Sequence, residues 1–428
     1  MFHPGRENSQ TINPFDYSAR GLLFHPLALF VGVWGLIIFL YSLHLSGLLV
    51  FSTARVLMLA LWIVVPYVAS VIGFQIFCAF APKRLVARRD QQPLALDELD
   101  RRLVHWFVFW LVCTLVEIKV SGGVPILWLL QGSSKTYMDF GIPSVHGFLN
   151  SLLLAIGVGQ FGLFALDGKK RHLLIPAWIV LWSVIAVTRN IMIVSLIQNA
   201  VVWGVVRGVR KRTLFNGAVI LLALILLFGY VGDFRSGADV FRAAAMPTAE
   251  FPEWLPSGAL WVYIYLATPI GNLVNTAAIA SPQYNLLFPN TAALLLPSVL
   301  RKLVYGEASL NDALSGELVT DAFNVSTAYV GPFQDYGRLG MVGFSVLLGL
   351  IASYYWRKRT FRDALIYGVI GQILVLSIFF NHLFYLPVIS QIPWLFVFFP
   401  IATKNQSKSG VKNRSRGWIE LAVLGKSN

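Results

Sequence analysis

Three arginines lie at the ends of long apolar segments, where a charge is costly unless it has a partner or a task. Arg189 interrupts the apolar run IAVTRNIMIV. Arg235 lies in GYVGDFRSG beside Asp233, and Arg338 lies in PFQDYGRLG beside Asp335. A guanidinium stays protonated in apolar surroundings and forms forked hydrogen bonds to phosphate oxygens. If the three side chains meet at one membrane depth, they form a site for an anionic headgroup such as a lipid-linked diphosphate.

A simpler interpretation of these arginines stays open. Each side chain could reach a lipid phosphate by itself, or pair with the aspartate beside it. Arg189 is the sharpest candidate because it has no carboxylate within several positions. We therefore assign Arg189, Arg235 and Arg338 to diphosphate binding, and expect Arg189 and Arg235 to be needed for catalysis.

A general base is expected near Arg338. Asp335, with Tyr336 next to it, could remove the proton of an acceptor hydroxyl during attack on a sugar anomeric carbon. An acid in a loop is often only solvated, so this role rests on proximity to the arginine. Three other acids are weaker rivals for the same role: Asp233, Glu317 and Asp321.

Aromatic rings and amides suited to a sugar occur in two further segments, because rings stack on apolar sugar faces and amides bind hydroxyls. Tyrosines are also ordinary residues at a membrane interface, and turns and helix caps explain part of the second segment. The segments are WVYIYLATPIGNLVN and GSSKTYMDFGIPSVHGFLN. With Tyr336, they supply the candidate substrate-binding residues: Lys135, Tyr137, His146, Tyr263, Tyr265, Asn272 and Asn275.

Several familiar chemistries have no signature in the chain. It contains no GxxxxGK[ST], HExxH, CxxC or GxSxG motif, and its seven histidines are scattered. Cys78 and Cys113 both fall within apolar segments. We therefore predict neither a metal site nor a cofactor. The net charge of +14 lies in short clusters between apolar runs, which argues against a nucleic-acid partner.

The elements that must position these residues are membrane helices. Of 428 residues, 57% are hydrophobic and only 13% are charged, which is too apolar for a soluble globular protein. Apolar runs long enough to cross a hydrocarbon core recur along the chain. They predict an all-α membrane protein with about ten helices, near residues 27–43, 56–80, 103–120, 145–166, 173–188, 190–206, 213–231, 339–355, 364–381 and 385–402.

The basic residues predict the topology. Ten crossings with both termini in the cytoplasm place most Lys and Arg inside, as the positive-inside rule requires, where they also meet membrane lipids. The first helix should be retained, because no small-residue cleavage signature follows it. We expect one transmembrane domain over residues 1–403 and a basic cytoplasmic tail over 404–428. The main outer loops are then residues 118–144 and 232–338.

The second outer loop contains an apolar stretch, GALWVYIYLATPIGNLVNTAAIA. Pro269 and Gly271 are expected to interrupt it. We therefore predict short or re-entrant helices in this loop, since broken helices are tolerated at membrane depth where they line a cavity.

The chain resembles the Wzy-type O-antigen polymerases, a family of oligosaccharide repeat-unit polymerases of bacterial inner membranes. The similarity lies in TYMDFGIPSVHGFLN, TRNIMIVSLIQ, GYVGDFRSG, YIYLATPIGNLVN and STAYVGPFQDYGRLGMVG. It covers residues 100–350, whereas the last 80 residues match in hydropathy only. Arg189, Arg235 and Arg338 stand at the family's motif positions as ligands of the donor diphosphate.

The resemblance implies a GT-C-like, metal-independent membrane glycosyltransferase with a periplasmic active site. Such an enzyme transfers a growing glycan from undecaprenyl diphosphate to the next undecaprenyl-diphosphate-linked repeat unit, as in lipopolysaccharide O-antigen biosynthesis. A polysaccharide chain-length regulator is then a candidate partner. Two alternatives remain: an O-antigen ligase, which uses the same donor, and a transporter or flippase of lipid-linked oligosaccharides.

Overall fold

The chain is helical throughout the part that the structure describes. The computed structural model describes residues 19–80, 96–209, 238–252, 254–255, 257–306, 316–358 and 360–400, with a few positions between 212 and 223. Within these ranges the one extended contact is an isolated bridge between Ser46 and Pro247. The predicted all-α class is confirmed.

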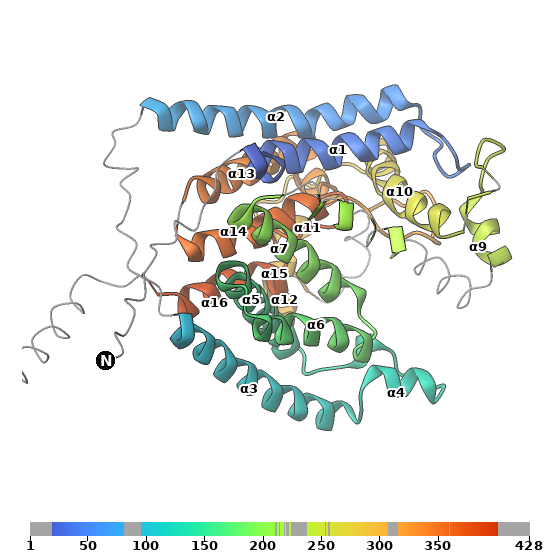
Figure 1. The fold of residues 1–428 in the computed structure, drawn as a ribbon. Helices are drawn as coiled ribbons and strands as arrows, with labels where there is room; N and C mark the ends of the chain where they lie inside the picture. Colours follow the sequence, from blue (N-terminus) through green and yellow to red (C-terminus); the bar gives the residue numbers. More distant parts are fainter. Residues whose placement is uncertain are drawn as a thin grey trace, which may run out of the picture.

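The longer helices form the bundle in Figure 1. They are α1 (Pro26–Ser42), α2 (Thr53–Phe80), α3 (Leu96–Ser121), α5 (Val145–Asp167), α6 (Leu174–Ile185), α7 (Arg189–Arg207), α10 (Ser257–Ile279), α13 (Val330–Arg357) and α14 (Phe361–Leu376). Short elements connect or flank them: η1 (Ala19–Phe24), α4 (Pro125–Leu130), η3 (Tyr137–Asp139), η4 (Lys170–Leu173), α9 (Ala238–Ala245), α11 (Pro289–Ala292), η5 (Ala293–Leu295), α12 (Ser298–Tyr305), α15 (Leu386–Ile389) and α16 (Gln391–Phe398).

Six helical segments among the described residues are long and apolar enough to cross a membrane. They are α2, α3 with α4, α5, α7, α10 and α13. Two shorter apolar helical segments, α1 and α15 with α16, join them in the bundle. The prediction of a helical membrane protein is confirmed at this level, whereas ten crossings and a GT-C-like fold stay predictions. Most of the predicted helix 213–231, and the tail 404–428, lie outside the described residues.

The apolar stretch of the second outer loop differs from its prediction. Residues Ser257–Ile279 form one continuous helix, α10, with Pro269 inside it. The expected interruption at Pro269 and Gly271 is therefore wrong. A proline is tolerated within a buried apolar helix when neighbouring elements satisfy the freed carbonyl groups.

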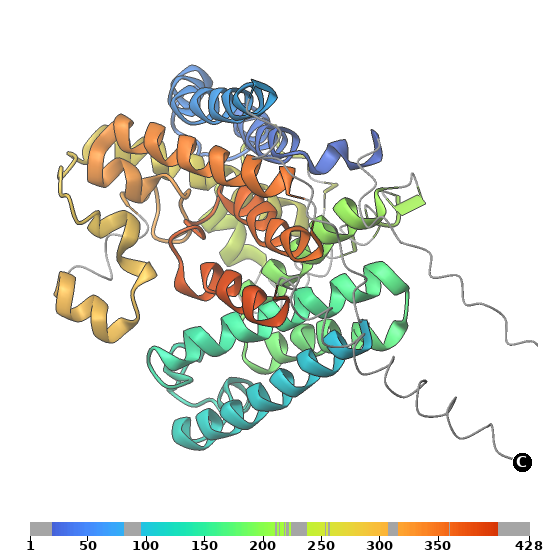
Figure 2. The ribbon, with the colours of Figure 1, turned by 90° about the vertical axis from the view of Figure 1, so that its left-hand side faces the viewer.

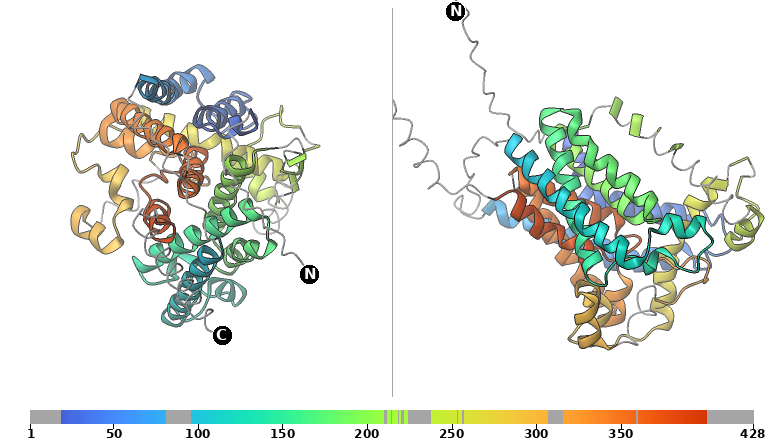
Figure 3. Two further views of the ribbon diagram at one scale, coloured as in Figure 1. Left: turned by 60° about the vertical axis from the view of Figure 1, so that its left-hand side comes forward. Right: turned by 90° about the horizontal axis from the view of Figure 1, so that it is seen from below.

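Helices α5 and α14 form the centre of the bundle. Nearly every residue of α14 is buried, and α5 is buried over the full run from Ser151 to Gln160. Around them, α1, α2 and α13 pack along one side and α3 lies on the opposite side, as Figures 1 and 3 show. Helix α7 contacts α5, α6 and α14. The small residues of α5 and α14 allow this close packing between helices.

We call the end of the bundle where η1, η4 and the start of α3 lie the inner end, after the predicted topology. There the Tyr367 hydroxyl donates to the carbonyl of Phe24 over 2.6 Å. Arg102 donates to the carbonyl of Phe398 over 3.0 Å. The opposite end, where α5 and α7 begin, is the outer end.

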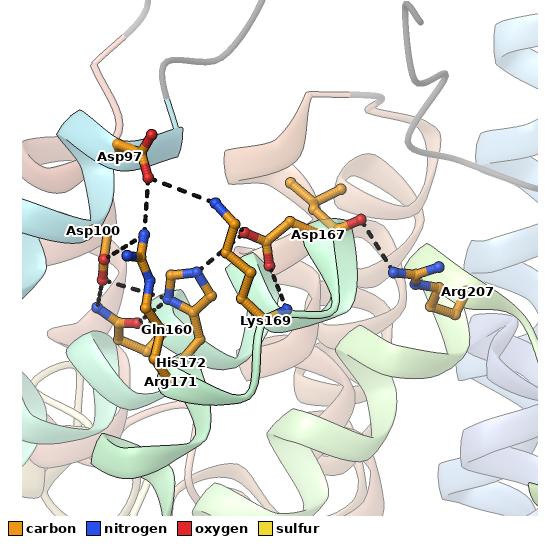
Figure 4. A network of polar contacts seen from close by, with 9 residues as sticks. Asp97, Asp100, Gln160, Asp167, Lys169, Arg171, His172 and Arg207 are labelled. Atoms are coloured by element: carbon orange, nitrogen blue, oxygen red, sulfur yellow. Dashed lines mark hydrogen bonds and ion pairs between the residues drawn. The ribbon is translucent and has the colours of Figure 1, made fainter.

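A polar network fastens the inner end, as Figure 4 shows. The buried His172 ring lies between α3 and α5, with Nδ1 2.9 Å from Gln160 Oε1 and Nε2 3.2 Å from Asp167 Oδ2. Gln160 in turn donates to Asp100 over 2.8 Å. Because both ring nitrogens face oxygen acceptors in a buried setting, the ring ties three elements together.

The rim of this network is exposed. Arg171 pairs with Asp97 over 2.8 Å and with Asp100 over 3.1 Å, and Lys169 lies 3.3 Å from Asp167. The Asp97 side chain is 77% exposed. Exposed ion pairs contribute little to stability because water screens them, so the buried histidine should carry most of the stabilisation.

Replacing His172 by Leu should destabilise the protein by about 2–4 kcal/mol, because the buried oxygen of Gln160 loses the ring and Asp167 keeps only its contacts with Lys169. The measurement is the Tm of the purified protein in detergent. Asp97→Asn is the matched control on the exposed rim and should leave the Tm unchanged. Equal Tm values for both variants would show that the buried ring does not fasten this end.

Candidate functional site

Helices α5 and α7 begin at the same level of the outer end. A Cβ atom at Gly368 of α14 would lie 2.6 Å from a methyl group of Val202 and 3.6 Å from one of Val158. Each valine lies 13 residues after the first residue of its helix, Val145 or Arg189. At about 1.5 Å per residue the two helices therefore start at matching depths, and packed helix axes lie about 8–10 Å apart.

The turn before α7 is suited to an anion. Val187 adopts φ +54°, a left-handed conformation that strains a β-branched residue. Thr188 precedes the helix without capping it, and its hydroxyl oxygen is buried without a hydrogen-bond partner among the described residues. Arg189 follows as the exposed first residue of α7. Uncapped amides, the positive end of the helix dipole and a guanidinium therefore lie together.

A buried carboxylate lies near the start of α5. Glu117 of α3 is 1% exposed and accepts a hydrogen bond from the amide of Ile142 over 3.0 Å. Its other oxygen lies 3.1 Å from Nδ1 of His146. The predicted residue His146 thus has a partner that the sequence interpretation missed. An acidic residue within the apolar run WLVCTLVEIKV was the available signal, because such residues are rare in membrane helices.

The backbone fixes the His146 ring from the other side. Gly141 has φ +96°, and a Cβ atom there would lie 2.6 Å from Cγ of His146. The Phe140 ring meets the imidazole edge to face at 5.4 Å between centroids. A glycine is therefore required where the loop passes the ring, and the ring has little freedom to turn.

Lys135 fastens the same outer loop. Its ammonium group donates to the carbonyl of Ser121 over 2.9 Å and lies 5.3 Å from the centre of the Trp128 ring. Asp139 caps the turn η3, and hydrogen bonds from Thr136 hold the pKa of its carboxyl below the usual range. The loop therefore keeps its shape at neutral pH. Tyr137 of this turn is exposed.

The arch formed by α11, η5 and α12 reaches the start of α5. It extends away from the bundle in Figure 2, in light orange at the left. The hydroxyls of Ser144 and Ser298 lie 2.9 Å apart. Arg301 of α12 was not among the predicted residues, yet its Nε atom is buried without a hydrogen-bond partner in the described part of the chain. Burial raises the pKa of Tyr385, and the positive charge of Arg301 offsets part of that rise.

Asp335 lies fully buried beneath this arch. One carboxylate oxygen accepts from the amide and the side chain of Asn290 over 3.1 and 2.8 Å, and the other accepts from the amide of Thr291 over 2.8 Å. Burial raises the pKa of Tyr305, and the negative charge of Asp335 raises it further. The carboxylate thus anchors the start of α11, a position that hinders direct contact with a substrate hydroxyl.

The motif that contains Asp335 is kinked. Gly337 adopts φ +58° inside α13, which turns the chain directly after Tyr336. The guanidinium of Arg338 then lies 5.4 Å from the centre of the Trp62 ring of α2. Arg189 stands at the start of α7, which packs on other helices. The convergence of these two arginines thus stays a prediction without a contact to support it, and Arg235 lies outside the described residues.

The side-chain amides of Asn272 and Asn275 on α10, which were predicted to bind sugar, form hydrogen bonds to main-chain atoms of a neighbouring segment. Asn272 donates to the carbonyls of Phe323 and Val325 over 3.2 and 2.8 Å and accepts from the amide of Val319 over 2.9 Å. Asn275 donates to the carbonyl of Leu318 over 3.2 Å. These amides hold residues 317–325 against the helix, so little of their hydrogen-bonding capacity is left for a sugar.

The predicted tyrosines also pack within the outer end. The Tyr263 hydroxyl accepts from the amide of Leu45 over 2.9 Å. Tyr265 contacts the ring of Phe323, and Tyr336 contacts the rings of Tyr284 and Phe288. These three of the four predicted tyrosines thus stabilise outer segments, and a role in sugar binding stays a prediction.

No group of three or more His, Cys, Asp and Glu residues suited to a metal ion occurs among the described residues. No protein-family model matches the chain, and neither a curated protein nor a solved structure matches it.

Proposed function

We propose that the chain is a metal-independent glycosyltransferase that polymerises undecaprenyl-diphosphate-linked oligosaccharide repeat units at the outer face of a bacterial inner membrane. The resemblance of residues 100–350 to repeat-unit polymerases names the substrate class. A transmembrane bundle with polar groups at one end is compatible with a substrate that has a lipid tail and a hydrophilic head.

One geometric inference carries the proposal: the contacts of Gly368 indicate that α5 and α7 start at similar depths, so the fixed His146 ring and the start of α7, which no side chain caps, belong to the same end of the bundle. Polymerisation needs both kinds of group. The leaving diphosphate needs positive charge to stabilise the charge that develops on it, and the acceptor hydroxyl needs a base. Arg189 and the start of α7 fit the first need.

The location of the candidate functional groups at one end of the bundle favours an enzyme over a transporter. Alternating access places a binding site near the bilayer midplane and gives it ionisable groups there. In the described part of the chain, the polar groups proposed for function lie at the outer ends of helices, whereas the polar network of the inner end is satisfied internally. The transporter is therefore the weaker alternative.

Glycan profiling of a deletion strain tests the proposal. A polymerase deletion should leave lipid A cores that carry a single repeat unit, because ligation still proceeds without chain growth. The same strain complemented with the full chain should regain the ladder of long glycans. Loss of every cap, including the single repeat, would instead indicate a ligase or a flippase and would overturn the proposal.

A further inference from the structure

We propose that His146 is the general base of the transfer reaction and that Glu117 is its positioning residue. This inference rests on the proposed glycosyltransferase function and names the group that accepts the proton. It also moves that role from Asp335, the expected base, to a pair of residues contributed by α3 and α5.

The hydrogen bonds of Glu117 define the tautomer of His146. In the proposed pair Glu117 acts as a carboxylate, which only accepts hydrogen bonds, and Nδ1 of His146 lies 3.1 Å from its Oε2. The proton of the neutral ring therefore resides on Nδ1, and Nε2 keeps its lone pair. Among the described residues, no hydrogen-bond partner satisfies Nε2.

The side chains of His146 and Glu117 differ in solvent exposure. The Glu117 side chain is 2% exposed, whereas that of His146 is 27% exposed. The imidazole therefore reaches the outer surface while its carboxylate partner is shielded from water. Burial strengthens the interaction of the carboxylate with the imidazolium that forms when Nε2 takes a proton.

The ring is also held in one orientation before substrate binds. Gly141 passes against one side of it, and Phe140 meets it edge to face. The Ile142 amide holds the second oxygen of Glu117, so the carboxylate cannot turn away. Such preorganisation is what a catalytic base requires, because a misplacement of about 1 Å can cost about 100-fold in rate.

The acceptor hydroxyl oxygen forms a bond to the anomeric carbon of the donor glycan, and its proton passes to Nε2 of His146. The bond between the anomeric carbon and the diphosphate oxygen breaks, and the diphosphate leaves with the electron pair. Arg189 and the start of α7 bind that leaving group.

Asp335 is a poorer base on the same criteria. Its side chain is fully buried, and three hydrogen-bond donors occupy its two oxygens. An acceptor hydroxyl would have to displace the start of α11 to reach it. His146 needs no such rearrangement.

The test uses the full chain in proteoliposomes with undecaprenyl-diphosphate-linked repeat units extracted from the deletion strain. His146→Gln should lower kcat by about 100-fold or more, the usual range for removal of a general base. The wild-type rate should fall towards acid pH as the ring becomes protonated, and this acid limb should disappear in the variant. His105→Gln, on the exposed surface of α3, is the matched control and should behave as wild type.

Glu117→Gln tests the positioning role. It should lower kcat by about 100-fold and move the acid limb of the pH profile, while KM for the donor stays close to wild type. Nitrogen-15 NMR of labelled histidine should show the proton of neutral His146 on Nδ1 in the wild type and a mixture of tautomers in the variant. The NMR readout does not depend on enzymatic activity.

The possible failures are distinguishable. If the wild type does not extend the repeat units, the proposed function fails and the base assignment fails with it. If the wild type extends them and His146→Gln keeps both the rate and the acid limb, only the base assignment is overturned. A His146 ring protonated on Nε2 in the wild type would also overturn it.

Discussion

Arg189→Ala should lower polymerisation by about 100- to 1,000-fold, the usual effect of removing one donor that stabilises developing negative charge. The reason is local: the guanidinium begins α7, next to backbone amides that no side chain caps and that carry the positive end of the helix dipole. Long glycans should disappear from a complemented deletion strain, while single-repeat caps remain. In proteoliposomes the loss should fall mainly on kcat, since the charge to be stabilised develops as the diphosphate departs.

Two further variants sharpen this prediction. Arg189→Lys keeps the charge but loses the forked geometry, so it should fall between the wild type and the alanine variant. Arg55→Ala, an exposed arginine at the outer end of α2 that packs on the Phe51 ring, is the control and should keep full activity. A normal ladder from Arg189→Ala at wild-type protein levels would remove Arg189 from the reaction.

Asp335→Asn should destabilise the protein by about 2–4 kcal/mol, because an amide offers one oxygen where the carboxylate offers two. At least one donor from Asn290 or Thr291 would then face an NH2 group in a buried site. The expected measurement is a lower Tm in detergent, with activity reduced in proportion to the unfolded or rearranged fraction. Asp321→Asn, in an exposed position, is the control and should leave the Tm unchanged.

The same variant distinguishes anchoring from proton transfer. If Asp335→Asn kept its Tm and lost activity with an altered pH profile, the carboxylate would act in the reaction as the sequence first indicated. If neither Tm nor activity changed, the three hydrogen bonds would contribute nothing measurable. The buried hydrogen bonds of Asp335 favour neither of these results but the lower Tm predicted above.

The helices could be predicted because membrane hydrophobicity is a local property of the chain. Segment 145–166 was expected and α5 spans Val145–Asp167; segment 190–206 was expected and α7 spans Arg189–Arg207. Helix α10 was missed as a continuous helix because proline was treated as a break. In water, a proline in the interior of a helix destabilises that helix by about 3 kcal/mol or more. Within a packed membrane bundle, neighbouring groups offset the loss of the hydrogen bond.

The site could be predicted only in part, because its partners are distant in sequence. His146 and Lys135 were identified as candidates, yet Glu117 lies 29 residues from His146, and nothing local pairs them. Arg301 was missed since it reads as an ordinary charge on an amphipathic helix. Conversely, the backbone contacts of Asn272 explain a motif that looked suited to sugars.

The polar face of α10 affects which residues of the neighbouring segment 317–325 can change during evolution. Asn272, Asn275 and Thr276 grip residues 317–325 through main-chain atoms alone. These hydrogen bonds do not depend on the side chains of that segment. Variants can therefore replace the surface residues of segment 317–325 while its backbone keeps its course, so the chemistry of this outer surface can change at little cost to folding.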